Sequence, residues 1–100
     1  MDARFGEPSV LILTSLSGGA KHGYALIKDI EEIAGATLGP GTLYGALARL
    51  ERQGLVEALP AEERRRPYRI TPAGAEAVRL YLEHVQGVAR VGLKRLQAYT

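Results

Sequence analysis

The stretch "LGPGTLYGALARLERQGL", residues 38–55, combines a leucine-spaced helix with a front that is almost bare of side chains. Leu43, Leu47 and Leu50 recur at helical spacing, and Gly54 stands where a left-handed residue ends a helix. A rotation of about 100° per residue gathers the leucines on an inner face. It places on the outer face Gly41, Gly45, Ala48, Arg49 and Arg52. The sequence therefore predicts an amphipathic helix whose exposed edge is thinly covered at its start.

Gly45 lies inside this predicted helix, where glycine costs roughly 1 kcal/mol relative to alanine. Close approach of the helix backbone to another surface explains such a residue, and the major groove of B-DNA is wide enough to admit one helix. Arg49 and Arg52 follow one and two turns later, and arginine is the usual donor to phosphates and guanine edges. Taken alone, the pattern equally allows a tolerated glycine and two solubilising arginines, because such signals are weak locally.

Two further helices are expected before this one. The first carries the apolar run 10–16, follows Pro8-Ser9, and stops at Gly18-Gly19. The second has Tyr24, Ile27, Ile30 and Ile33 at helical spacing and ends at Gly35. Two helices joined by a few glycine-containing residues are typical of a helix-turn-helix.

The segment after Gly54 indicates a β-hairpin. Residues 55–59 and 67–71 are short and β-compatible, and the leading proline of the second run suits an edge position. The polar stretch "PAEERRR", residues 60–66, forms the expected tip. A two-stranded ribbon is unstable alone and must pack against the helices, so the hairpin is predicted to be a wing.

A long C-terminal helix is expected from Thr71-Pro72, an N-cap followed by proline at the first helical position. Its apolar positions alternate in spacings of four and three, which is a heptad seam. The seam consists of Val78, Leu82, Val85, Ala89, Gly92 and Leu96. The seam could simply cover the protein's own core, but a helix of about 25 residues spans roughly 38 Å and overreaches so small a domain. We expect its distal half to pack against a second copy.

Together these elements predict a mainly α, α+β winged helix-turn-helix fold with a three-helix core, a two-stranded wing and a long C-terminal dimerisation helix. The predicted domains are residues 1–71, which bind DNA, and residues 72–100, which dimerise. The segment "AKHGYAL", residues 20–26, is expected to open the second helix, where free backbone N–H groups and the helix dipole attract a phosphate, with Lys21, His22 and Tyr24 beside them. Arginines on the wing tip can reach the phosphate backbone or a minor groove. The candidate DNA-binding residues are Lys21, His22, Tyr24, Gly41, Thr42, Tyr44, Gly45, Arg49, Arg52, Arg64, Arg65 and Arg66.

The composition argues against several other classes of protein. The 100 residues include no cysteine, which excludes disulfides and cysteine-based metal sites. The net charge is only +2, but the clustered arginines favour a polyanion. The apolar runs are too short to span a bilayer and no signal peptide is evident, so we expect a cytoplasmic protein with no membrane partner.

Catalysis has little support in the sequence. His22 and His84 lie in separate segments without metal-ligand spacing. The stretch "GGAKHG" lacks the final serine or threonine of a phosphate loop, and no buried strand leads into it. We therefore expect no enzyme activity, no catalytic residues, no metal and no cofactor.

Three ordered motifs carry a family resemblance. "HGYALIKDIEE", "GTLYGALARLERQGLV" and "RRPYRITPAGAEAV" resemble the PadR family of bacterial transcriptional regulators, in particular its short members. The resemblance implies a winged helix-turn-helix that binds an operator as a homodimer, usually as a repressor relieved by a small effector. Because a dimer presents two wings and two recognition helices, we expect the operator to be roughly palindromic. It also implies that Tyr24, Thr42, Tyr44 and the wing arginines fall where the family touches DNA.

The chain departs from the family pattern at three points. Gly45 stands where proline is usual, and Gly39 stands where serine commonly precedes Pro40, which predicts a weaker cap on the third helix. Some short members bind flat aromatic compounds with a tryptophan in the last helix, whereas this chain has no tryptophan.

An alternative function is a winged-helix adaptor that binds proteins and not DNA. Steep salt dependence of binding distinguishes DNA contacts from an adaptor surface.

Overall fold

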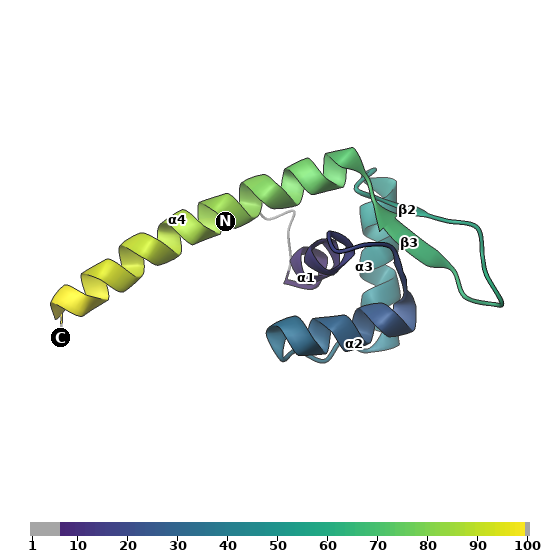
Figure 1. Ribbon diagram of the computed structural model, residues 1–100, viewed down its shortest axis with the longest axis horizontal. Helices are drawn as coiled ribbons and strands as arrows, with labels where there is room; N and C mark the ends of the chain where they lie inside the picture. The colour runs from purple at the N-terminus through teal and green to yellow at the C-terminus, as the bar shows by residue number, and fades with distance from the viewer. Residues whose placement is uncertain (1–6, 100) are drawn as a thin grey trace.

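The computed structural model describes residues 7–99. Along this part of the chain, four helices and three short strands follow one another (Figure 1). They are α1 (Glu7–Leu16), β1 (Lys21–His22), α2 (Gly23–Ala34), α3 (Pro40–Arg52), β2 (Val56–Ala58), β3 (Pro67–Ile70) and α4 (Pro72–Tyr99). The mainly helical winged helix-turn-helix predicted from the sequence is confirmed.

The core lies between the first three helices. Its members are aliphatic side chains at spacings of three and four, so that each helix presents one stripe inward. They are Ile12, Leu13 and Leu16 of α1, Leu26 and Ile30 of α2, and Leu43, Ala46, Leu47 and Leu50 of α3, and Val56 and Val78 from the later part of the chain complete the core. Burying each large aliphatic side chain stabilises the fold by about 1.5–3 kcal/mol. The inner face predicted for α3 is therefore the observed one.

The helix ends follow the predicted signals. Gly35 has φ 64° and donates its N–H to the carbonyl of Glu31 at 2.9 Å, which ends α2 in a left-handed cap. Gly54, with φ 76°, plays the same part after α3. The N-cap of α3 is Gly39, which offers no side-chain hydrogen bond. The start of α3 is thus capped more weakly than a serine would cap it.

The small sheet has one strand more than predicted. Its order is β1-β3-β2, and both pairings are antiparallel, with Val56 opposite Ile70 and Lys21 opposite Tyr68. The sequence pattern predicts Lys21 and His22 at the opening of α2, but they form β1, and α2 begins at Gly23. Two residues carry no alternating pattern, so only the approach of β3 turns them into a strand.

Helix α4 projects far beyond the rest of the molecule, as Figure 1 shows. Thr71 caps it by accepting the N–H of Gly74 at 3.0 Å through its hydroxyl. Val78, predicted to be part of the dimer seam, is only 3% exposed and packs in the protein's own core, because α1 lies against the first turns of α4. From Leu82 onward the seam residues are exposed. The first turns of α4 therefore complete the winged domain, and only the later seam positions are free for a partner.

Candidate nucleic-acid interface

The outer face of α3 is bare over its first turns. Nothing lies within 4 Å of the position that a Cβ would take at Gly41 or Gly45. Ala48 and Arg52 continue the same exposed face, as the helical wheel predicts. Because no neighbour within the described chain requires a small residue at Gly45, packing of the protein on itself does not explain this glycine.

Tyr44 joins α3 to the start of α2. Its side chain is half exposed, and its ring passes over Gly23. A Cβ at Gly23 would lie 2.8 Å from Cζ of Tyr44, and closer still to the hydroxyl. The ring of Tyr44 therefore occupies space that is open only because residue 23 is a glycine. Gly23 is not among the site residues predicted from the sequence, although its place between the candidates His22 and Tyr24 was an available signal.

His22 connects the start of α2 to the wing. Its Nδ1 lies 3.5 Å from the backbone nitrogen of Ala25, and its Nε2 lies 3.3 Å from Nη1 of Arg65. A neutral imidazole has one acceptor nitrogen, so only one of these two contacts is a hydrogen bond at a time. The contact with Arg65 brings a wing arginine next to the free N–H groups of the α2 N-terminus.

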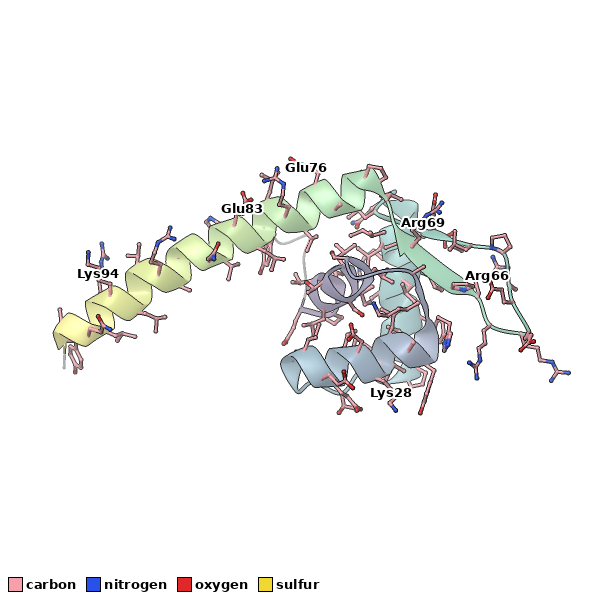
Figure 2. All side chains as sticks on the ribbon, in the orientation of Figure 1. Lys28, Arg66, Arg69, Glu76, Glu83 and Lys94 are labelled. Carbon is pink, nitrogen blue, oxygen red and sulfur yellow. The ribbon has the colours of Figure 1, made fainter. Side chains whose placement is uncertain are left out.

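The wing tip is a two-residue turn that exposes its arginines. Glu62 and Arg65 exchange backbone hydrogen bonds of 2.6 and 2.8 Å. Between them Glu63 and Arg64 have φ values of 47° and 73°, the left-handed region that favours glycine. Figure 2 shows Arg66 in the outer part of the wing and Arg69 nearer its base. The wing therefore carries exposed cations on a tightly turned hairpin.

Arg69 differs from the other wing arginines because it has a carboxylate partner across the sheet. Its Nε donates to Oε1 of Glu57 at 2.8 Å, and the two residues are paired in the β2–β3 register. Both side chains are exposed, so the pair contributes little stability. It neutralises the base of the wing and leaves the positive charge concentrated toward residues 64–66.

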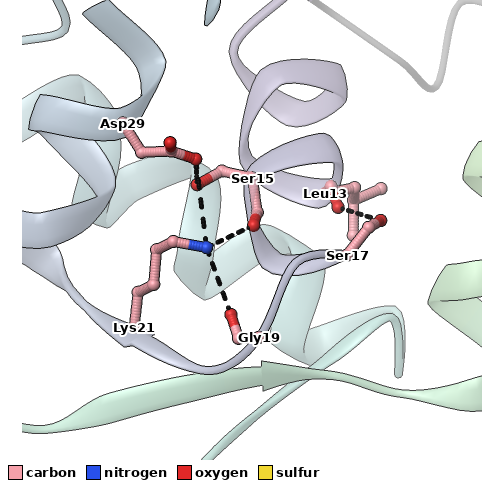
Figure 3. A network of polar contacts seen from close by, with 6 residues as sticks. All are labelled: Leu13, Ser15, Ser17, Gly19, Lys21 and Asp29. Atoms are coloured by element: carbon pink, nitrogen blue, oxygen red, sulfur yellow. Dashed lines mark hydrogen bonds and ion pairs between the residues drawn. The ribbon is translucent and has the colours of Figure 1, made fainter. Parts of the chain in front are cut away.

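Lys21 has a structural position that the sequence analysis did not foresee. Its Nζ donates to the carbonyl oxygens of Ser15 at 2.5 Å and Gly19 at 3.3 Å, and lies 3.9 Å from Oδ2 of Asp29 (Figure 3). The hydroxyl of Ser15 donates to the same carboxylate oxygen at 2.5 Å. The network ties the end of α1 to β1 and α2. It takes up the ammonium group that was predicted to meet a phosphate.

Arg49 lies at the edge of the bare face that adjoins α1. Its Nη2 is 3.4 Å from the hydroxyl oxygen of the buried Ser9, so the guanidinium reaches across to the first turn of α1. Arg52 is nearer the middle of the exposed face by its position on the helical wheel. The contact between Arg49 and Ser9 could not be predicted from the sequence pattern, because the two residues are 40 positions apart in the chain.

Tyr68 lies behind this surface, where β3 passes between the other strands. Burial raises the pKa of the Tyr68 hydroxyl, and the nearby Glu51 and Tyr44 add to the effect while Arg66 opposes it. The phenol thus stays neutral at any physiological pH. Tyr68 links α3 to the wing without carrying charge.

Within residues 7–99, no group of three or more histidine, aspartate or glutamate side chains is placed to hold a metal ion. Over the same residues, no helix is both long enough and apolar enough to cross a membrane. The strongest constellation in this part of the chain is the surface formed by α3, the α2 N-terminus and the wing.

Comparison with known proteins identifies the family. Residues 12–80 match the transcriptional regulator PadR-like family. The chain belongs to the PadR-like family of transcriptional regulators. The match runs from α1 into α4 and therefore includes every element that builds the surface described above.

Individual proteins to which the chain is similar include transcriptional regulators. The chain superimposes on a PadR family transcription regulator from Clostridium difficile R20291 with a TM-score of 0.81, at 25% identity over 91% of this chain and 99% of the other. It is 32% identical to the transcriptional activator GvpE2 of Halobacterium salinarum over 96% of this chain and 49% of that protein. It is 49% identical to an uncharacterized 37.1 kDa protein in transposon TN4556 of Streptomyces fradiae, over 73% of this chain and 21% of that protein. The chain thus spans between about a fifth and a half of the length of these two curated relatives.

Proposed function

We propose that this PadR-like chain binds double-stranded DNA sequence-specifically, as a homodimer on a palindromic operator, and acts as a repressor. The α3 helix enters the major groove, the N-terminus of α2 meets the phosphate backbone, and the wing arginines contact the adjacent backbone or minor groove. The contacts proposed are those of the sequence analysis, except that Lys21 supports the fold.

One observation carries the proposal, namely the open space around Gly41 and Gly45. A glycine inside an exposed helix weakens it by about 1 kcal/mol, so a helix selected for stability alone would not keep it. A helix that lies deep in a groove benefits, because its backbone can come closer to the base edges. Arg49 and Arg52, on the same outer face of α3, supply the positive charge that a phosphate backbone attracts.

A homodimer is supported by the exposed apolar side chains along α4. Leu82 and Val85 are about two-fifths exposed, and Leu96 is 60% exposed. Leaving such a stripe in water is unfavourable by about 25 cal/mol for each Å² that a partner could cover. A two-fold dimer also presents two α3 helices, which suits a palindromic site.

Repression needs no more than occupation of the operator. A DNA-facing domain and a dimerisation helix account for residues 7–99, and together they suffice to block access to a promoter. The GvpE2 relative is named an activator, so reporter assays with and without the protein are needed to determine the sign of regulation.

The salt dependence of binding tests the proposal. Duplexes are first selected from a random pool, and the affinity of the selected duplex is then measured at several salt concentrations. We expect a steep fall in affinity, with a slope that decreases by roughly one for each phosphate contact removed. The variant Arg64→Ala/Arg65→Ala should weaken binding to all duplexes and flatten the slope. The control Arg90→Ala/Lys94→Ala removes the same charge from α4 and should leave the slope unchanged.

Two results would contradict the proposal. One is that no duplex is enriched above background. The other is that the wing variant and the α4 variant reduce affinity equally, since DNA would then respond only to total charge. Salt-insensitive capture of a protein partner would instead favour the adaptor.

A further inference from the structure

The imidazole of His22 lies between two hydrogen-bond donors. Its Nδ1 faces the backbone N–H of Ala25, with 3.5 Å between the two nitrogens, and its Nε2 lies 3.3 Å from Nη1 of Arg65 on the wing. A neutral imidazole has one acceptor nitrogen, and a guanidinium has none. Whichever donor the ring accepts from, its other nitrogen carries a proton that points at a donor. One hydrogen-bonding need at His22 is therefore left unmet within the protomer.

A protonated His22 would need an acceptor from elsewhere. The imidazolium donates through both nitrogens and accepts through neither, so it keeps neither of the two contacts. Arg65 beside it is a permanent cation with donors only. Within residues 7–99, no carboxylate is hydrogen-bonded to His22 or paired with it. An anion next to both side chains would supply what the protonated ring lacks.

The helices and β1 around His22 do not provide that anion. Lys21, its neighbour in β1, is itself a cation, and the carboxylate of Asp29 lies 3.9 Å from the Lys21 ammonium, as part of the network in Figure 3. In α3, Glu51 lies near the hydroxyl of Tyr68. The other titratable side chains on the adjoining turns are Tyr24 and Lys28 of α2 and Tyr44 of α3.

The wing does not provide it either. Pro67 stands opposite His22 in the sheet and carries no charge. Glu62 and Glu63 at the wing tip are exposed, and in the part of the chain that the structure describes neither side chain is paired with Arg65. The remaining charged pair on this hairpin is Glu57 with Arg69, and Arg66 donates to the carbonyl oxygen of Leu59 at 3.4 Å.

We propose that His22 takes up a proton when the protein binds DNA, so that its imidazolium and the guanidinium of Arg65 hold one backbone phosphate together. A phosphate offers adjacent acceptor oxygens, and donors 3.3 Å apart can reach the same group. Both side chains then donate to oxygen, and the phosphate charge lies beside two positive ones. The proton uptake rests on the DNA binding of the proposed function and makes that binding depend on pH.

The direction of the pH dependence follows from the coupling. Binding that takes up a proton becomes tighter as the proton concentration rises. Histidine is the side chain that ordinarily changes its charge between about pH 5 and pH 8. The chain has two histidines, His22 and His84, and His84 lies on the exposed part of α4. We therefore expect affinity for DNA to rise as the pH falls through this range.

Affinity for the selected duplex at constant salt, measured at several pH values, tests the coupling. From about pH 8 to about pH 6, wild type should bind more tightly by on the order of tenfold or more. His22→Asn should lose most of this change, because asparagine is a good N-cap that can accept the N–H of Ala25 but takes up no proton. The control His84→Gln removes the other histidine and should behave as wild type does.

Calorimetry in two buffers of different ionisation enthalpy measures the proton uptake directly. Wild type should take up a fraction of a proton, approaching about one for each protomer, and His22→Asn close to none. Wild-type affinity that does not change with pH would overturn the inference while leaving DNA binding established. The same holds for a pH dependence that survives in His22→Asn. Failure to bind any duplex at every pH would overturn the proposed function, and the proton uptake with it.

Discussion

Among the glycines of the described chain, Gly74 leaves the least space for a side chain. A Cβ there would overlap the carbonyl oxygen of Leu55 and lie 2.9 Å from Cγ1 of Ile70, so the first turn of α4 can approach the backbone just before β2 only because this residue has no side chain. We expect Gly74→Ala to lower the free energy of unfolding by about 1–3 kcal/mol. The control Gly87→Ala, in the same helix with open surroundings, should raise it by up to about 1 kcal/mol. Urea unfolding of both variants checks this, and equal shifts would contradict it.

Tyr68 gives the stability a dependence on alkaline pH. Burial, then the charge of Glu51, raises the pKa of its hydroxyl above the ordinary 10.0, so the folded protein holds this proton more tightly than the unfolded chain does. Its contribution is complete below the unfolded pKa and is lost as the pH rises toward the folded pKa. We therefore expect wild type to lose stability relative to Tyr68→Phe between about pH 8 and pH 10.5. Urea unfolding at both pH values measures the difference, which should remain constant if the account is wrong.

At the scale of elements, the sequence predicts what depends on local pattern. The three core helices, their glycine ends and the Thr71 cap follow from spacing and from the conformational needs of single residues. Strand β1 does not, because a two-residue strand exists only through its pairing with β3. The roles of Lys21 and Val78 were likewise missed, since each depends on how closely α1 approaches another element. For the candidate site, the helical wheel predicts the bare face of α3 from the sequence. The contact of Tyr44 with Gly23 could not be predicted, because it depends on how α2 and α3 pack together.

The wing turn supplies a prediction for one element. Glu63 and Arg64 occupy left-handed conformations that cost about 1 kcal/mol or more for residues with a Cβ, whereas Asn-Gly adopts them readily. Glu63→Asn/Arg64→Gly should therefore slow hydrogen exchange at the amides of Glu62 and Arg65. Ala61→Gly, outside the two central positions, should not slow it. Equal or faster exchange in the Asn-Gly variant would mean that the turn is not held in this conformation.

For the whole molecule, the division of α4 between core and seam makes substitutions at neighbouring seam positions act differently. Val78→Asp should unfold the protein, because it buries an unpaired charge in the core. Val85→Asp should leave each protomer folded and split the proposed dimer, because Val85 is exposed in the protomer. Sedimentation and circular dichroism together separate these outcomes, with Lys94→Asp, on the side of α4 that carries Glu76 and Glu83 (Figure 2), as the control. A Val85→Asp protein that remains dimeric would place the interface elsewhere.

The central claim is that the bare edge of α3 lies against DNA, and substitution at Gly45 tests it most directly. Gly45→Gln meets no neighbour within the described chain, and glutamine is a better helix former than glycine. The protein should therefore unfold at the same or a higher temperature than wild type. Its affinity for the selected duplex should fall on the order of tenfold or more, because the new side chain holds the backbone away from the groove. Unchanged affinity in a stably folded Gly45→Gln protein would contradict the account.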